Sequence, residues 1–152
     1  MSERVRIRNE VIGAVKVEAE AAYPYECCGF LLGSDANPGA DADDAASRTV
    51  EAILAVKNER EGDPARRRFS IGPQDYLAAE RKAEETGLDL VGIYHSHPDH
   101  PAVPSETDLA QALPWYTYLI VSAERGAAGD VAAWRLAEDR SAFAPEEIKV
   151  VW

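Results

Sequence analysis

Two spacings of hydrophobic positions recur along the chain, one typical of helices and one typical of strands. Near-helical spacing predicts a helix from about Asn9 to Tyr23, which Pro24 ends. A second helix is predicted from Pro73, a favoured first helical residue, to Gly87. Short apolar or alternating segments predict strands at ECCGFLLG, TVEAILAVKN, RFSI, LDLVGIYHSH, WYTYLIVSA, DVAAWRLAE and IKVVW.

The predicted strands and helices are interspersed, and several links between strands are too short to contain a helical crossover. This order predicts an α/β (α+β) fold with a mixed, mostly antiparallel sheet flanked by helices. The length of 152 residues favours one domain, which we place at residues 1–152. The segment from Ser34 to Ser47 is small, acidic and rich in turn residues, so we expect a mobile loop there without assigning it a role.

The net charge and the cysteines limit which binding partners and which cellular compartment we expect for this protein. Sixteen basic and 27 acidic residues give a net charge of −11, which disfavours binding to nucleic acid or to anionic membranes. Cys27 and Cys28 are adjacent and cannot cross-link distant segments, so we expect them to be small buried hydrophobic residues in a reducing compartment. Without a secretory signal or membrane span in the sequence, we expect a cytoplasmic protein. A homodimer is compatible with the sequence.

All three histidines of the chain lie in the segment HSHPDH, at the end of a predicted strand. Because side chains alternate along a strand, His95 and His97 share one face, about 7 Å apart along the backbone. Two convergent imidazoles can bind one metal ion, although an isolated His-x-His pair is more often an ordinary surface feature.

One interpretation of this segment uses four residues. HSHPDH fits the His-x-His-x-Asp-His string of metallo-β-lactamase-like hydrolases, with His95, His97, Asp99 and His100. That family also needs histidines later in the chain, and none follows His100.

A second interpretation continues downstream, where Ser105 is followed by ETDLAQAL and begins a helix with the pattern of a capping box. Asp108, in the first turn, is mounted rigidly enough to be a third ligand, and the helix N-terminus favours its charged form. Two histidines and one aspartate leave a fourth tetrahedral position for water, as in catalytic zinc sites. The Ser105 hydroxyl can also donate to a developing oxyanion. A plain capping box explains Ser105 and Asp108 equally well, and the two interpretations are compatible.

The sequence resembles the JAMM (MPN+) metallopeptidase family, in its small prokaryotic single-domain form. The resemblance covers His95-Ser96-His97, a seven-residue spacer, Ser105, a two-residue spacer, Asp108 and the upstream segment PYECCGFLLG from Pro24 to Gly33. It implies a cytidine-deaminase-like sandwich around a strongly curved sheet. It also implies Zn²⁺ held by His95, His97, Asp108 and a water, with Glu26 as general acid/base and Ser105 as oxyanion stabiliser.

The resemblance implies a peptidase that hydrolyses the amide or isopeptide bond after the C-terminal Gly-Gly of a ubiquitin-like or sulfur-carrier protein. For Glu26, its apolar neighbours independently predict partial burial and a raised pKa, whereas the alternative is a glutamate at a strand edge pointing to water. An inert scaffold or binding module of the same fold stays open as another function. The run Arg66-Arg67-Arg68 could clamp an acidic partner tail, although such a run is more often a solvated edge.

Overall fold

The computed structural model describes residues 3–35, 46–66 and 68–152. The predicted loop from Ser34 to Ser47 therefore lies mostly outside the described residues. Along the chain the elements are β1 (Glu3–Arg8), α1 (Asn9–Ala22), β2 (Cys28–Ser34), β3 (Ala46–Val56), the 3₁₀ helix η1 (Asp63–Arg66), α2 (Pro73–Thr86), β4 (Asp89–Pro98), α3 (Glu106–Gln111), β5 (Thr117–Glu124), β6 (Ala127–Leu136) and β7 (Phe143–Val151).

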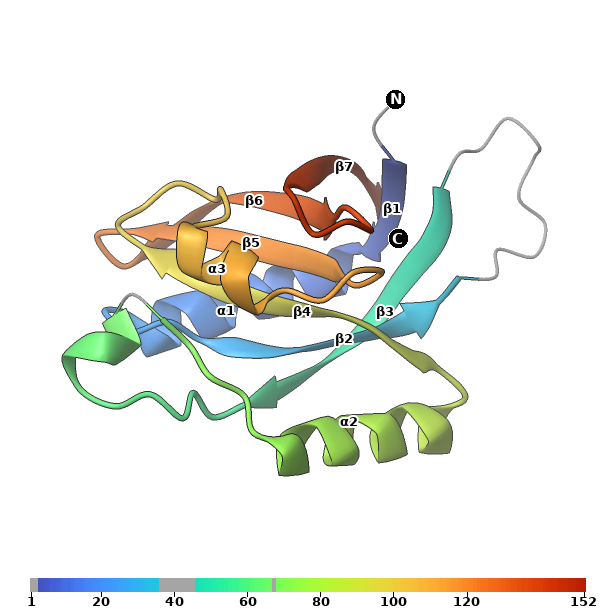
Figure 1. The fold of residues 1–152 in the computed structure, drawn as a ribbon, viewed down its shortest axis with the longest axis horizontal. Coiled ribbons are helices and arrows are strands. Elements are labelled where there is room, and N and C mark those ends of the chain that lie inside the picture. Colours follow the sequence, from blue (N-terminus) through green and yellow to red (C-terminus); the bar gives the residue numbers. More distant parts are fainter. Residues whose placement is uncertain (1–2, 36–45, 67) are drawn as a thin grey trace.

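Seven strands form one strongly curved sheet that closes on itself in the order β1-β3-β2-β4-β5-β6-β7 (Figure 1). The pairs β2–β3, β2–β4, β5–β6 and β6–β7 are antiparallel. The pairs β4–β5, β1–β3 and β1–β7 are parallel, and β1 closes the ring because it pairs with both β3 and β7. The prediction of a mixed, mostly antiparallel sheet with helices beside it is confirmed.

Helices cover both faces of this sheet, and each face has its own hydrophobic core. α1 packs Val11, Val15 and Ala19 onto the first core, which includes Leu31 of β2. The neighbouring Phe30 points to the opposite face, because side chains alternate along a strand. That second core is covered by α2 and α3, so β2 and β4 lie between two layers (Figure 1).

The structure differs from the prediction in two segments. β1 was not predicted, although its alternation of buried Val5 and Ile7 with arginines is a strand pattern. The segment RFSI was predicted as a strand, and this is wrong. The backbone of this segment bonds to a side chain and not to a neighbouring strand. The Asn58 side chain accepts a hydrogen bond from the Ser70 amide at 3.0 Å and donates one to the Arg68 carbonyl at 3.0 Å.

The two predicted long helices are confirmed. α1 ends at Ala22, just before Pro24. α2 begins at Pro73 and ends at Thr86, and the following Gly87 adopts the left-handed conformation (φ 72°) that favours glycine. None of the helices in the described part of the chain is long and apolar enough to cross a membrane.

Candidate metal centre

His95 and His97 lie near the end of β4, a central strand between β2 and β5. His95 is paired with Cys28 on one side and with Ile120 on the other, and His97 with Ser122. Both histidines are buried. As the alternation along the strand predicts, their rings lie on the same side, and the two Nε2 atoms are 3.2 Å apart.

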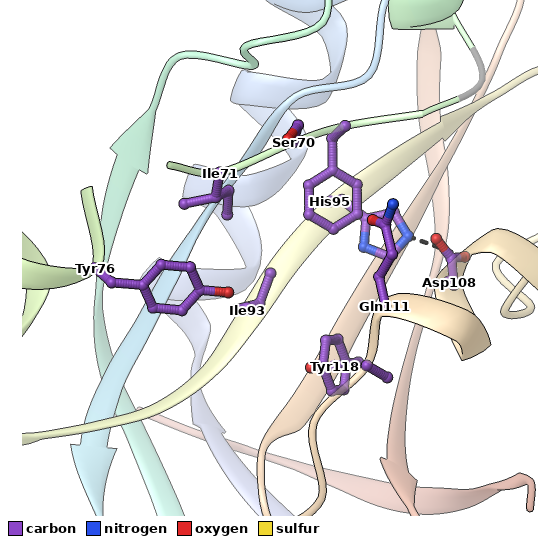
Figure 2. A pocket seen from close by; sticks show the side chains of 10 residues that line it. Ser70, Ile71, Tyr76, Ile93, His95, Asp108, Gln111 and Tyr118 are labelled. Carbon is purple, nitrogen blue, oxygen red and sulfur yellow. Dashed lines mark ion pairs between the residues drawn. The ribbon is translucent and has the colours of Figure 1, made fainter. Parts of the chain in front are cut away.

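Asp108 comes from the first turn of α3, where the predicted capping box is confirmed. The Ser105 Oγ accepts a hydrogen bond from the Asp108 amide at 3.0 Å, and the Ser105 amide donates one to Asp108 Oδ2 at 2.9 Å. The same Oδ2 lies 3.1 Å from His97 Nε2 and 3.3 Å from His95 Nε2. Figure 2 shows Asp108 reaching from α3 towards His95.

The triangle formed by these three atoms matches the spacing that a metal ion requires. Ligands at about 2.0–2.1 Å from a tetrahedral zinc ion lie about 3.3 Å from one another. His97 Nδ1 donates to the Pro101 carbonyl at 2.8 Å, so Nε2 of the neutral ring presents a lone pair to the carboxylate. Such a contact is repulsive unless a positive charge lies between the two atoms. The cluster is therefore compatible with a metal site.

The charge states of the cluster also suit a metal ion. Burial alone would raise the pKa of the Asp108 carboxyl, but the neighbouring His95 and His97 rings and the Ser105 amide hold that pKa well below its usual range. Burial lowers the pKa of His95, so a proton on this ring is a costly way to supply the positive charge at neutral pH. A carboxylate and neutral imidazoles are the forms that bind metals.

The loop after β4 is held by three side chains, each of which donates to a different, consecutive backbone carbonyl. Ser122 Oγ donates to His100 O at 2.7 Å, His97 Nδ1 to Pro101 O, and Trp134 Nε1 to Ala102 O at 3.1 Å. The loop therefore fixes the orientation of the His97 ring, as outer partners of metal ligands commonly do. The sequence did not reveal this arrangement, because Ser122 and Trp134 come from β5 and β6.

Asp99 helps to hold the loop after β4 in place and is not part of the cluster of His95, His97 and Asp108. It adopts a left-handed conformation (φ 58°), and its carboxylate accepts hydrogen bonds from the Tyr23 hydroxyl and from the Arg125 amide, both at 2.7 Å. The ligand set of the metallo-β-lactamase-like interpretation, which needs Asp99 beside the histidines, is therefore not assembled.

Glu26 lies in the connection between α1 and β2. Its amide donates to the Ala65 carbonyl at 2.7 Å, and its carbonyl accepts from Asn58 Nδ2 at 3.2 Å. The predicted burial is confirmed, because the residue is 4% exposed, and its Oε1 has no hydrogen-bond partner among the described residues. Burial, together with the negative charge of Asp108, raises the pKa of Glu26 to about 9. A divalent cation nearby acts in the opposite direction.

Two hollows flank the cluster, and each is lined by a different set of residues. The first, of about 230 Å³, holds His95 and Asp108 at one end, and aromatic and aliphatic residues together with Ser70 and Gln111 line the rest of it (Figure 2). Phe69, from the segment wrongly predicted as a strand, stacks on the His95 ring with the two ring centres 4.5 Å apart. The second hollow, of about 390 Å³, is lined by Glu26, Arg68, His97, His100, Pro101, Val103, Ser105 and Thr107.

The other residues singled out in the sequence lie outside these contacts. Cys27 and Cys28 are buried as predicted, and burial raises the pKa of their thiols to about 11 and about 12. Arg66 lies near Asp63 and over the Tyr25 ring, and Arg67 is outside the described residues.

Comparison with known proteins places this site in a family. Residues 8–137 match the family model described as prokaryotic homologs of the JAB domain. The chain is 34% identical over 116 residues to a desampylase of Haloferax volcanii, which covers 76% of this chain and 75% of that protein. It is 30% identical over 146 residues to the CysO-cysteine peptidase of Mycobacterium tuberculosis, covering 95% and 90% of the two chains.

Solved structures show the same fold. A protein from Salinibacter ruber matches with a TM-score of 0.72 and 42% identity over 96% of this chain and 91% of that chain. A JAB1/MPN domain protein from Archaeoglobus fulgidus matches with a TM-score of 0.59 over 97% and 99% of the two chains, and at 18% identity this match shows the fold alone.

Proposed function

Because the chain belongs to the family of prokaryotic JAB-domain homologs, we propose that it is a zinc peptidase acting on ubiquitin-like or sulfur-carrier proteins. It hydrolyses the amide or isopeptide bond that follows the C-terminal Gly-Gly of such a protein. The observation that carries this proposal is the meeting of three ligand atoms 3.1–3.3 Å apart between two hollows, one lined by His95 and Asp108 and the other by His97 and the buried Glu26. The names of the relatives, desampylase and CysO-cysteine peptidase, support the same class of reaction.

In this proposal His95, His97 and Asp108 hold the zinc ion. When bound, zinc supplies a Lewis acid that lowers the pKa of a water and polarises the scissile carbonyl. The capping box and the Pro101 carbonyl keep Asp108 and His97 oriented for this purpose.

Glu26 moves the proton in both halves of the reaction. As a carboxylate it accepts the proton of the attacking water, and as a carboxylic acid it returns that proton to the nitrogen of the leaving amine. Its burial keeps the proton affinity high enough for the second step, and the metal's positive charge brings the pKa down towards neutrality for the first.

Ser105 stabilises the oxyanion of the tetrahedral intermediate. Its Oγ accepts a hydrogen bond from the Asp108 amide, and this leaves the hydroxyl proton free to donate to a substrate oxygen. The same hydrogen bond caps the N-terminus of α3, so the helix cap also fixes the orientation of the Ser105 hydroxyl.

A glycine-rich tail suits a site of this size, because an extended segment without side chains can pass along a narrow channel to the metal. The first hollow, which reaches His95 and Asp108, is the side on which we place the tail. The alternative of an inert scaffold predicts a protein that binds no zinc and hydrolyses no such bond.

The test combines metal analysis with mass spectrometry of a carrier protein that bears extra residues after its Gly-Gly. Wild type should contain one zinc ion per chain and trim the carrier to its diglycine end. Glu26→Ala should keep the metal and lose activity, whereas Asp108→Ala should lose both; Asp99→Ala is the control that tests the metallo-β-lactamase-like interpretation. Full activity of Glu26→Ala, or a zinc-free wild type that cleaves several such carriers no faster than Asp108→Ala, would refute the proposal.

A further inference from the structure

A cationic side chain lines the second hollow together with Glu26, in a chain whose net charge is −11. This cation is Arg68, whose side chain is exposed. Within residues 3–35, 46–66 and 68–152 the guanidinium of Arg68 forms no ion pair, whereas its neighbour Arg66 lies 3.8 Å from Asp63. Arg68 is therefore available to a ligand that enters the hollow.

The backbone of Arg68 is fixed relative to Glu26. The Arg68 amide donates to the Pro64 carbonyl at 3.0 Å. The side-chain amide of Asn58 donates both to the Arg68 carbonyl, at 3.0 Å, and to the Glu26 carbonyl, at 3.2 Å. One side chain thus holds together the segment that carries the proton donor and the segment that carries the cation.

The proposed reaction places the leaving group in this same hollow. Glu26 gives its proton to the leaving nitrogen, so that nitrogen must approach the side of the metal cluster on which Glu26 lies. Among the described residues that line the other hollow there is no cationic side chain, and the charged group there is Asp108 itself. A negative charge on the leaving group is therefore favoured only on the side of Arg68.

The leaving groups of this reaction class differ in where they carry such a charge. When a single amino acid follows the Gly-Gly, its free α-carboxylate lies within about 4 Å of the scissile nitrogen, given the lengths of the N–Cα and Cα–C bonds. When the bond is an isopeptide to a lysine side chain, four methylene groups separate the nitrogen from a backbone that carries no free carboxylate. Arginine and carboxylate groups form charge-assisted, often paired hydrogen bonds.

We infer that Arg68 binds the α-carboxylate of an amino acid joined to the Gly-Gly end and so selects this leaving group over an isopeptide-linked protein. The inference rests on the proposed peptidase function. Arg68 is then a specificity-determining residue, which contacts the substrate beyond the scissile bond.

The test compares two carriers that differ only in the charge of interest. One ends in Gly-Gly-Ala with a free carboxylate, and the other ends in the same sequence with a C-terminal amide. Wild type should cleave the acid with a kcat/KM about tenfold higher than the amide, as expected for a partly exposed hydrogen bond to a charged group. Arg68→Gln should remove this preference, Arg68→Lys should keep part of it, and Arg66→Gln should keep it all.

A binding measurement separates recognition from turnover. In a Glu26→Gln background, where cleavage is blocked, the carrier with the free carboxylate should bind more weakly after Arg68→Gln, by a similar factor, and the amide carrier should not. Thermal unfolding of each variant shows that the fold is kept.

The outcomes distinguish this inference from the function on which it rests. Equal kcat/KM for acid and amide in wild type, or an unchanged preference in Arg68→Gln, would overturn the role of Arg68 and leave the peptidase intact. If wild type cleaves neither carrier, nor an isopeptide-linked one, the proposed function fails and this inference fails with it.

Discussion

Replacing Glu26 with glutamine should change how the stability of the metal-free protein depends on pH. The folded protein holds the Glu26 proton with a pKa of about 9, whereas an ordinary glutamate has a value of 4.5. Between these two pH values the folded state keeps a proton that the unfolded state releases. The stability that this carboxyl contributes is therefore complete below about pH 4.5 and is lost as the pH rises towards 9.

The size of the effect follows from the window between the two pKa values. Each pH unit inside the window corresponds to about 1.4 kcal/mol for one proton. From pH 5 to pH 7, wild type should therefore lose about 3 kcal/mol of unfolding free energy relative to Glu26→Gln, which has no proton to hold. Glutamine has nearly the same size, so the comparison changes the charge and leaves the packing in place.

The assay is urea unfolding followed by tryptophan fluorescence, after removal of metal with a chelator, at pH 5, 6, 7 and 8. The difference between the two proteins isolates Glu26, because the other titrating groups occur in both. Glu85→Gln, which removes an exposed carboxylate from α2, is the matched control and should follow wild type. Added zinc should flatten the difference, since a nearby cation favours the ionised carboxyl. Parallel curves for wild type and Glu26→Gln in the metal-free state would show that Glu26 is already ionised there and would refute the reasoning.

Three further substitutions test the packing against Tyr94, the helix cap at Ser105 and the hydrogen bond from Trp134 to the loop after β4. Gly29→Ala places a methyl group against the buried Tyr94 ring and should cost about 1–3 kcal/mol in urea unfolding, whereas Gly13→Ala, with open space around it, should cost nothing; equal stabilities would contradict the close approach. Ser105→Ala should lower the unfolding free energy by about 1 kcal/mol, because the helix cap is lost, and should lower kcat about 100-fold, because the oxyanion donor is lost. A loss of stability without a loss of kcat would show that Ser105 only caps the helix. Trp134→Phe removes the donor to the loop carbonyl and should weaken zinc binding about tenfold in competition with a chelator, and unchanged affinity would show that the loop does not orient the metal ligands.

The parts of the site that the sequence predicted depend on short-range rules. A strand with period two places His95 and His97 on one face, and a capping box places Asp108 in the first turn of the next helix. These local rules hold whatever the rest of the chain does, and the structure confirms both arrangements. The same is true of α1 and α2, whose apolar spacing and Pro and Gly boundaries are local signals.

What escaped prediction depends on contacts between distant segments. β1 is six residues long, four of which are arginine or glutamate, and it is a strand because β3 and β7 pair with it on both sides. The RFSI segment has the composition of a strand, but Asn58 satisfies its backbone and Phe69 packs on His95 instead. No pattern around Arg68 indicates that Asn58 ties it to Glu26, because that contact joins three separate segments.

The double pairing of β1 has a consequence for how the protein is made. β1 can join β3 early, but its bonds to β7 connect residues such as Arg4 and Glu147, which are 143 positions apart. A ribosome must therefore release almost the whole described chain before the ring can close, and until then one side of β1 is unprotected and able to pair with another molecule. The strand β4, which carries His95 and His97, is complete long before that moment, so the nascent chain can assemble its histidine pair while the far side of the barrel is still open.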